Sequence, residues 1–252
     1  MMNPNEKVKV LVLTGDGVNC ERETANAFEL AGASSEIRHI NEFIENSDLL
    51  ESYNILALPG GFSFGDELGS GKVFSLKLKK IFGEKIRRFV DKGRPVIGIC
   101  NGFQVLTKLD LFTGKPVVGL AGNENGKFIN KWVTVKIQET PSIWLKNIYK
   151  MKLPIRHGEG RIVFDESISQ DSIEDLINKG IFAMKYEGNP NGSQYSLAGL
   201  SDETGLVFGL MPHPEAAVND ALYPGGVQEG DLGLSIFRNA VNYIQEKQEG
   251  RS

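Results

Sequence analysis

The first half of the chain alternates segments of strand length with amphipathic segments of helix length. Strands, most of them apolar throughout, are predicted over Lys7–Thr14, Ser35–Ile40, Tyr53–Leu58 and Pro95–Cys100. Helices, in which apolar residues recur near the helical period, are predicted over Glu21–Gly32, Lys72–Asp91 and Phe103–Leu109. Because buried strands separated by helices are typical of a parallel sheet covered on both faces, this half predicts an α/β fold.

The pattern changes after Phe112. Apolar and polar residues alternate over Trp132–Ile137, which is typical of an antiparallel or edge strand. Further strands are predicted over Ile181–Tyr186 and Leu206–Leu210, and helices over Asp171–Lys179 and Asp231–Gln245. The sequence therefore predicts a mainly parallel sheet flanked by helices, with an antiparallel extension, in a single domain over residues 7–247.

Composition narrows the class of protein. Of the 252 residues, 40% are hydrophobic and 24% charged, which is typical of a globular chain. The net charge of -4 argues against a strongly basic, nucleic-acid-binding surface. The N-terminus lacks the apolar segment of a secretory signal, and no apolar run is long enough to cross a membrane. With only two cysteines, we expect a cytoplasmic protein that binds neither nucleic acid nor membranes.

The candidate chemistry centres on Cys100, in the sequence Gly98-Ile99-Cys100-Asn101-Gly102 between a buried strand and a helix. A lone buried cysteine is more often structural, but this frame is typical of a nucleophile elbow, with cysteine in place of serine. The glycines permit the sharp turn, and the helix N-terminus favours a thiolate. The backbone N–H of Asn101 is expected to face a developing oxyanion. Cys100 is therefore the candidate nucleophile.

A cysteine nucleophile needs a base, normally a histidine that another polar group holds. The chain has three histidines, and His39 is interpreted as structural because no orienting acid is near it in sequence. His157 and His213 each stand two residues before a glutamate, so their spacing does not separate them. His213 follows an apolar strand, where open α/β sheets build their sites, and it is favoured over His157, which we expect in a loop.

One other segment is a candidate part of the same site. Pro59-Gly60-Gly61-Phe62 follows another buried strand, and its adjacent amides suit an oxyanion or the main chain of a substrate; the alternative is an ordinary turn. Cys20 stands beside acidic residues and lacks an elbow frame, so it is assigned a structural or loop role.

Together these residues resemble the class I (triad) glutamine amidotransferases, whose fold is flavodoxin-like. The resemblance extends over five stretches, at residues 61–66, 98–104, 153–160, 186–192 and 209–215. It implies that Cys100, His213 and Glu215 form the catalytic triad. The residues that it assigns to glutamine binding and the oxyanion are Gly60, Gly61, Phe62, Asn101 and Gln104. His157 and Glu159 match a segment beside the site that faces a partner subunit.

The resemblance also implies an activity. L-glutamine is hydrolysed to glutamate and ammonia through a thioester on Cys100. All five stretches resemble the glutaminase subunits of the purine pathway, the third and fourth most specifically. The resemblance implies that ammonia passes to a separate ATP-dependent synthetase subunit, which converts formylglycinamide ribonucleotide to the amidine. A small accessory subunit is a further expected partner. Since the sequence has no P-loop and no metal-ligand spacing, we expect no cofactor or metal in this chain, and ATP and Mg²⁺ on the synthetase.

Three alternatives remain at this point. The chain could serve another synthetase, or it could be a cysteine peptidase or chaperone-like protein that shares the elbow. It could also be a non-catalytic regulatory subunit, although the intact Cys100, His213 and Glu215 argue against that.

Overall fold

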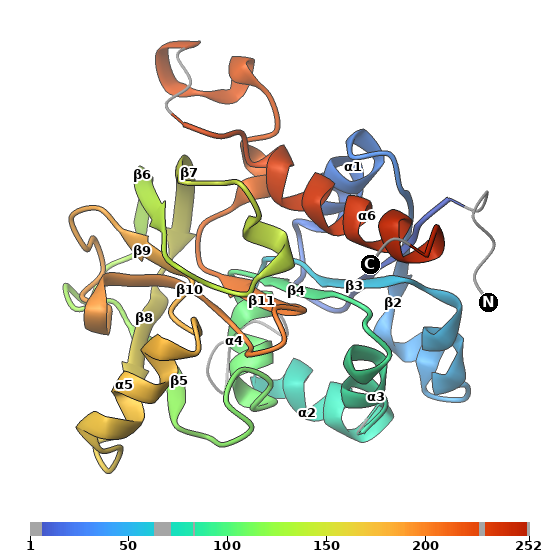
Figure 1. The fold of residues 1–252 in the computed structure, drawn as a ribbon, viewed down its shortest axis with the longest axis horizontal. Coiled ribbons are helices and arrows are strands. Elements are labelled where there is room, and N and C mark those ends of the chain that lie inside the picture. The colour runs from blue at the N-terminus through green and yellow to red at the C-terminus, as the bar shows by residue number, and fades with distance from the viewer. Residues whose placement is uncertain (1–6, 63–71, 83, 227–229, 251–252) are drawn as a thin grey trace.

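The computed structural model describes residues 7–62, 72–82, 84–226 and 230–250 (Figure 1). Residues 63–66, which belong to the first stretch of the resemblance, lie outside this part. The strands are β1 (Lys9–Thr14), β2 (Ser34–His39), β3 (Ile55–Leu58), β4 (Val96–Ile99), β5 (Val118–Gly122), β6 (Ile129–Ile137), β7 (Lys150–His157), β8 (Glu159–Phe164), β9 (Met184–Tyr186), β10 (Leu197–Ser201) and β11 (Val207–Leu210). The α-helices are α1 (Glu21–Leu30), α2 (Lys72–Ile81), α3 (Lys85–Asp91), α4 (Asn101–Lys108), α5 (Gln170–Asn178) and α6 (Leu234–Gln248).

A nine-stranded sheet in the order β2-β1-β3-β4-β11-β10-β9-β6-β7 forms the centre of the molecule. Its first five strands pair in parallel. Every residue of β3, β4 and β11 is buried, as expected for strands covered on both faces. The order 2-1-3-4 is that of flavodoxin-like sheets, so the predicted fold class is confirmed.

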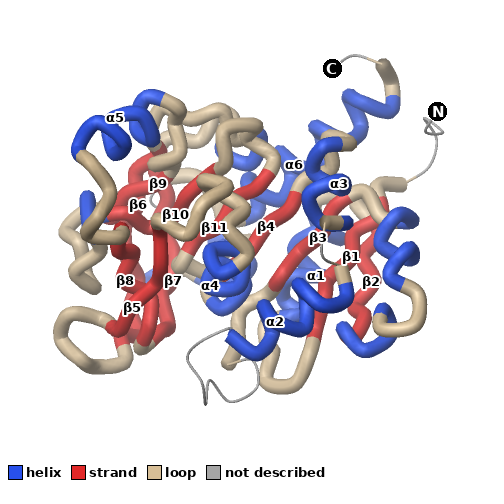
Figure 2. The backbone as a smooth tube through the Cα atoms, turned by 90° about the horizontal axis from the view of Figure 1, so that it is seen from below, coloured by secondary structure: helices blue, strands red, loops and turns tan. Residues whose placement is uncertain are grey.

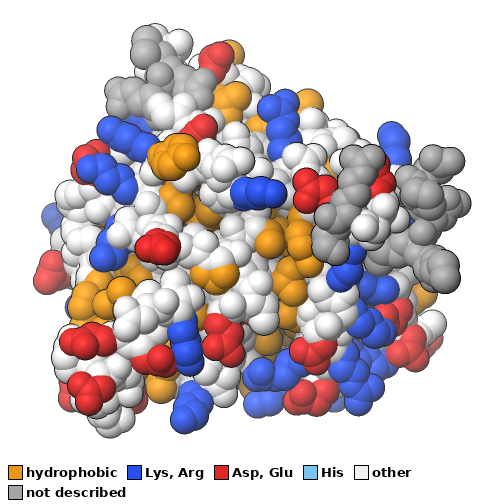
Figure 3. All heavy atoms as spheres, viewed as in Figure 1, with side chains coloured by type: hydrophobic (Ala, Val, Ile, Leu, Met, Phe, Trp, Pro, Cys, Tyr) orange, Lys and Arg blue, Asp and Glu red, His pale blue; other side chains and the backbone are white. Residues whose placement is uncertain are grey.

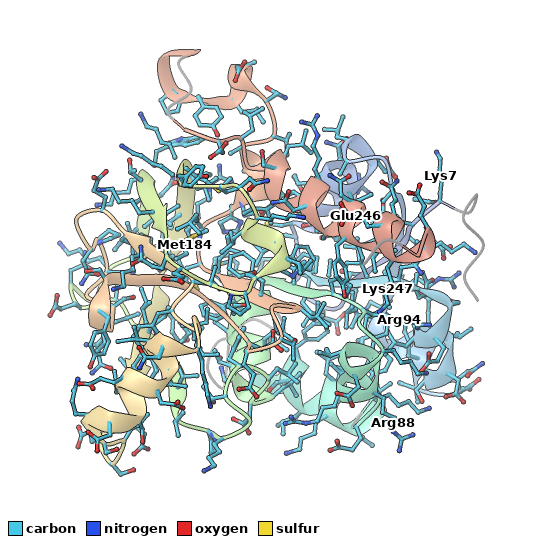
Figure 4. All side chains as sticks on the ribbon, viewed as in Figure 1. Lys7, Arg88, Arg94, Met184, Glu246 and Lys247 are labelled. Carbon is cyan, nitrogen blue, oxygen red and sulfur yellow. The ribbon has the colours of Figure 1, made fainter. Side chains whose placement is uncertain are left out.

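Helices cover both faces of the parallel half. Figures 1 and 2 show α1 and α6 on one face and α2, α3 and α4 on the other. The rings of Phe28 and Phe237 join α1 to α6 edge to face, with centroids 4.9 Å apart. At the far end of α6, Lys247 Nζ donates to the Lys92 carbonyl at 2.7 Å, close to Arg94 (Figure 4). These contacts fix α6 to α1 and to the turn that follows α3.

The other half of the sheet is antiparallel, as predicted. β10 pairs with β11 and β9, and β6 pairs with β9 and β7. The strand predicted at Trp132–Ile137 is the later part of β6 and lies between two neighbours, so it is not an edge strand. β5 and β8 form a separate two-stranded sheet beside it (Figure 2).

The prediction of one helix over Lys72–Asp91 is wrong, because α2 ends at Ile81 and α3 begins at Lys85. The Lys85 amide donates to the Phe82 carbonyl, which turns the chain between the two helices. Gly83 stands at this point in the sequence, and glycine is unfavourable inside a helix. Both helices still bury apolar residues in the core, Phe74 and Leu78 from α2 and Ile86 and Phe89 from α3, and this shared burial gives the sequence its continuous pattern.

On the face drawn in Figure 3, basic and acidic side chains are interspersed, and neither charge dominates. In the part of the chain that the structure describes, no helix has the length and apolar character needed to span a membrane. The single domain over residues 7–247 stays a prediction.

Candidate active site

The carboxyl ends of four neighbouring parallel strands, β1, β3, β4 and β11, meet at a cavity of about 210 Å³. The residues that line it include Cys20, Gly61, Cys100, Gln104, His157 and His213. Larger hollows, of about 230, 520 and 600 Å³, lie elsewhere, and the described residues that line them include no cysteine or histidine. Because open α/β sheets bind ligands at this edge, the smaller cavity is the candidate active site.

Cys100 occupies the sharp turn between β4 and α4. Its backbone angles, φ of 51° and ψ of -105°, lie outside the regions that residues other than glycine normally adopt. Such strain is expected of a nucleophile whose conformation is held by the surrounding structure. A Cβ at Gly98 would lie 2.6 Å from the Gly102 carbonyl oxygen, and one at Gly102 would collide with the Leu58 carbonyl. The close packing of the turn explains why glycine stands on both sides of Cys100.

His213 and Glu215 are close together and buried just past β11. His213 Nδ1 lies 2.6 Å from Glu215 Oε1, and the two residues are only 3% and 4% exposed. Burial disfavours the charged ring, but the carboxylate of Glu215 and the thiol of Cys100 outweigh it and hold the pKa of His213 well above its usual range. His213 Nε2 is buried and has no hydrogen-bond partner among the described residues. The ring therefore has one nitrogen fixed by a carboxylate and the other available.

The segment Gly60–Phe62 lies against the loop that follows β1. The amides of Asn19 and Cys20 both donate to the Gly60 carbonyl at 3.2 Å, and the Phe62 amide donates to the Gly17 carbonyl at 2.8 Å. Because the Phe62 amide is engaged, Phe62 can offer the cavity its ring, which is 48% exposed, but not its N–H.

Gly60 and Gly61 have no room for a side chain. A Cβ at Gly60 would lie 2.8 Å from His213 Cε1, and Gly61 has a φ of 145° that favours glycine. The backbone of this segment therefore approaches the histidine and the cysteine directly.

Asn101 and Gln104 form a buried chain of side-chain amides along α4. Asn101 Nδ2 donates to Gln104 Oε1 at 2.9 Å, and Gln104 Nε2 donates to the Glu159 carbonyl at 2.6 Å. Gln104 lines the cavity, and it also ties the elbow helix to the start of β8. The Glu159 side chain is partly buried at the same wall of the cavity.

His157 is the last residue of β7 and is 2% exposed, so its expected place in a loop is wrong. Its Nδ1 lies 2.9 Å from Asn123 Oδ1, while Asn123 Nδ2 donates to the carbonyls of His157 and Lys127. Since the Asn123 amide is oriented by two carbonyls, His157 Nδ1 is the donor and carries the proton. Burial, together with the charge of His213, lowers the pKa of His157 to about 4, so this ring is neutral at neutral pH.

His39 and Cys20 also have defined positions. His39 ends β2, and its Nδ1 accepts from the Asn41 amide at 3.2 Å, away from the residues that line the cavity. Cys20, which the sequence left in a structural or loop role, lines the cavity beside the His213 ring. Its position was available from the rule already used for Cys100, since Cys20 also follows the carboxyl end of a parallel strand.

Comparisons with known proteins agree with this geometry. The sequence model of the CobB/CobQ-like glutamine amidotransferase domain matches residues 7–244. The PurQ subunit of phosphoribosylformylglycinamidine synthase from Methanococcus maripaludis is 37% identical, over 94% of this chain and 98% of its own. The PurQ subunit from Dehalococcoides mccartyi is 38% identical, over 95% and 99%. In the solved structure of PurLQS from Thermotoga maritima, a chain that is 29% identical superposes with a TM-score of 0.75, over 95% of this chain and all of that one.

The class of protein follows from these matches: the chain belongs to the CobB/CobQ-like glutamine amidotransferase family, and the resemblance found in the sequence is confirmed. The curated relatives that it matches over nearly its whole length are PurQ subunits of phosphoribosylformylglycinamidine synthase.

Proposed function

We propose that the chain is the glutaminase subunit of phosphoribosylformylglycinamidine synthase, which releases ammonia from L-glutamine for purine biosynthesis. The observation that carries the proposal is that Cys100 and His213 line one cavity, with Glu215 holding the His213 ring, within a chain of this family. A strained cysteine beside a histidine that a carboxylate holds is the arrangement that nucleophilic acyl transfer needs.

The first half of the reaction forms a thioester. The Cys100 thiolate, stabilised by the charged ring of His213, attacks the side-chain carbonyl carbon of glutamine and drives electrons onto its oxygen. The oxyanion lies against the backbone amides of Gly60, Gly61 and Asn101, the last of which stands at the N-terminus of α4. His213 then gives its proton to the departing nitrogen, and the carbon–nitrogen bond breaks to release ammonia.

The second half restores the enzyme. Neutral His213 removes a proton from water, whose oxygen attacks the thioester carbon. The carbon–sulfur bond breaks, glutamate leaves, and the Cys100 thiolate faces a protonated ring again. Glu215 holds the ring through Nδ1 in both steps and stabilises its charge.

The remaining residues bind glutamine, or lie on the wall of the cavity beside it. The Phe62 ring and the Gln104 amide line the cavity in which the glutamine side chain lies. His157 is neutral and fixed by Asn123, and with Glu159 it lies on the wall that we place towards the synthetase. The chain itself needs no cofactor for this chemistry, and ATP and Mg²⁺ act on the synthetase. A small accessory subunit completes the complex, which works in the cytoplasm, where both cysteines remain thiols.

The test is reconstitution with the synthetase subunit. We expect the complex to form the amidine from formylglycinamide ribonucleotide and ATP with glutamine as the nitrogen donor, and the synthetase alone to require free ammonia. We also expect the glutaminase alone to turn over glutamine slowly. A complex that uses only free ammonia would overturn the proposal, and glutamine-dependent product with a different synthetase would support the alternative partner.

A methyl group at Gly60 tests the role of the backbone in this site. In Gly60→Ala the added carbon lies 2.8 Å from His213 Cε1, so the ring must move. We expect glutaminase activity to fall about 100-fold, the effect of a small displacement of a catalytic group. Gly122→Ala is the matched control, since a Cβ there meets nothing within 4 Å. Equal activities for the two variants would show that the position of the His213 ring does not limit the reaction.

A further inference from the structure

Three side chains that bind soft metal ions surround one point of the cavity. The position that a Cβ at Gly60 would take lies 2.8 Å from His213 Cε1, 3.4 Å from Cys20 Sγ and 3.5 Å from Cys100 Cβ. Because Gly60 has no side chain, no atom of that residue fills this point. Cys20, Cys100 and His213 all line the cavity wall. Two thiols and an imidazole therefore share a small space that is reached from outside.

The histidine is already held as a metal ligand would be. His213 Nε2 is buried without a hydrogen-bond partner among the described residues, and Nδ1 is fixed by Glu215. A carboxylate that holds the far nitrogen of a ligating histidine is common around bound zinc, because it fixes the ring and makes the free nitrogen more basic. Glu215 therefore serves as the outer partner of the ring.

The spacing suits one ion. Donor atoms of Cys20, His213 and Glu215 all lie within 4.8 Å of one another. Zinc binds a thiolate at about 2.3 Å and an imidazole nitrogen at about 2.0 Å, so ligands of one ion lie about 3 to 4 Å apart. An ion bound there requires the Cys100 side chain, whose Cβ lies 3.5 Å from the point beside Gly60, to turn its sulfur towards Cys20 and His213. Two thiolates and one imidazole select zinc over magnesium or calcium, which prefer oxygen ligands.

We propose that Cys20, Cys100 and His213 form an inhibitory site for a soft divalent cation, with zinc as the physiological ion and water as its fourth ligand. The bound ion occupies the sulfur of the nucleophile and the free nitrogen of the base, so glutamine cannot react while it is present. Cys20 supplies the third donor, which a catalytic pair of cysteine and histidine alone lacks. The inhibition rests on the proposed function, but metal binding is measured without glutamine, so the failure of the one is distinguished from the failure of the other.

Cobalt titration tests the site directly. The full-length protein is reduced, freed of metal and titrated with Co²⁺, whose thiolate charge-transfer band reports the number of sulfur ligands and whose visible bands report tetrahedral geometry. We expect one Co²⁺ per chain, with both signatures, and displacement by an equivalent of Zn²⁺ but not by excess Mg²⁺. Cys20→Ser and Cys100→Ser should each lose about half of the charge-transfer intensity and bind Co²⁺ at least about 10-fold more weakly.

The controls separate this site from adventitious binding. His39→Asn changes a histidine outside the cavity and should leave the cobalt spectrum unchanged, whereas His213→Asn should remove the tetrahedral signature. Thermal unfolding of each variant shows that it folds. Inhibition of glutaminase activity by Zn²⁺ should need at least about 10-fold more zinc in Cys20→Ser than in the unaltered chain. A cobalt spectrum without thiolate bands, or one that Cys20→Ser leaves intact, would overturn the proposal.

Discussion

Replacing Cys100 with alanine is expected to lower glutamine-dependent activity by about 10⁴-fold or more, the loss seen when a nucleophile of this kind is removed. The loss should appear in kcat, because the cavity that binds glutamine remains. In the complex with the synthetase, product formation from free ammonia should continue at its normal rate, since that step does not pass through Cys100. The measurement is product formation with each nitrogen donor.

The comparison of donors makes this result specific. A variant that loses both activities has lost its fold or its contact with the synthetase, and thermal unfolding of the isolated chain distinguishes these two cases. A Cys100→Ala complex that still uses glutamine would contradict the role of Cys100 as nucleophile.

Glu215→Gln is expected to lower kcat by about 10³-fold to 10⁴-fold, the range found when the carboxylate of a triad is replaced by an amide. The reason lies in the charge of His213. Without the carboxylate, the largest of the effects that raise the pKa of His213 is lost while burial still opposes the charge, so this pKa falls and the charged ring beside the thiolate is less populated. Nuclear magnetic resonance titration of His213 measures the change directly.

The same substitution changes how stability depends on pH. A histidine whose pKa is raised on folding stabilises the protein fully below its unfolded pKa of about 6.5, and this stabilisation is lost as pH rises through the raised value. The free energy of unfolding of the unaltered chain should therefore fall as pH rises above neutrality, and Glu215→Gln should remove this fall. Glu159→Gln, in the other His-x-Glu frame, is the matched control and should retain the fall, because His157 Nδ1 is held by Asn123. If the two variants behave alike, Glu215 does not set the charge of His213.

The parts of the site that could be predicted from the sequence are those that depend on a local backbone pattern. The apolar run of β4, followed by a cysteine between glycines, defines a strand, a turn and a helix within a few residues. Close packing around Gly98 and Gly102 is the physical reason that this pattern is so informative. The position of His213 after β11 was predicted on the same basis, since the carboxyl ends of parallel strands meet.

The parts that were missed depend on contacts between distant segments. His157 and Asn123 are 34 residues apart, and the pairings of β6 with β7 and of β5 with β8 bring the amide to the ring. The rule used for Cys100 places Cys20 at the same edge of the sheet, but its contact with the His213 ring depends on the backbone after β1, which lies against Gly60. The strands β5, β7 and β8 carry a weaker apolar pattern, because some of their residues are partly exposed, and the sequence did not indicate them. It also did not indicate β10, which is buried throughout but contains Gly199 and Ser201.

The most direct test of the account is the mass of the protein after exposure to a glutamine analogue with a reactive diazo ketone. The account predicts one adduct per chain, on the Cys100 peptide, which excess glutamine prevents and which forms far more slowly in Glu215→Gln. Addition to Cys20, or no adduct protected by glutamine, would contradict the claim that Cys100 is the nucleophile of a glutaminase.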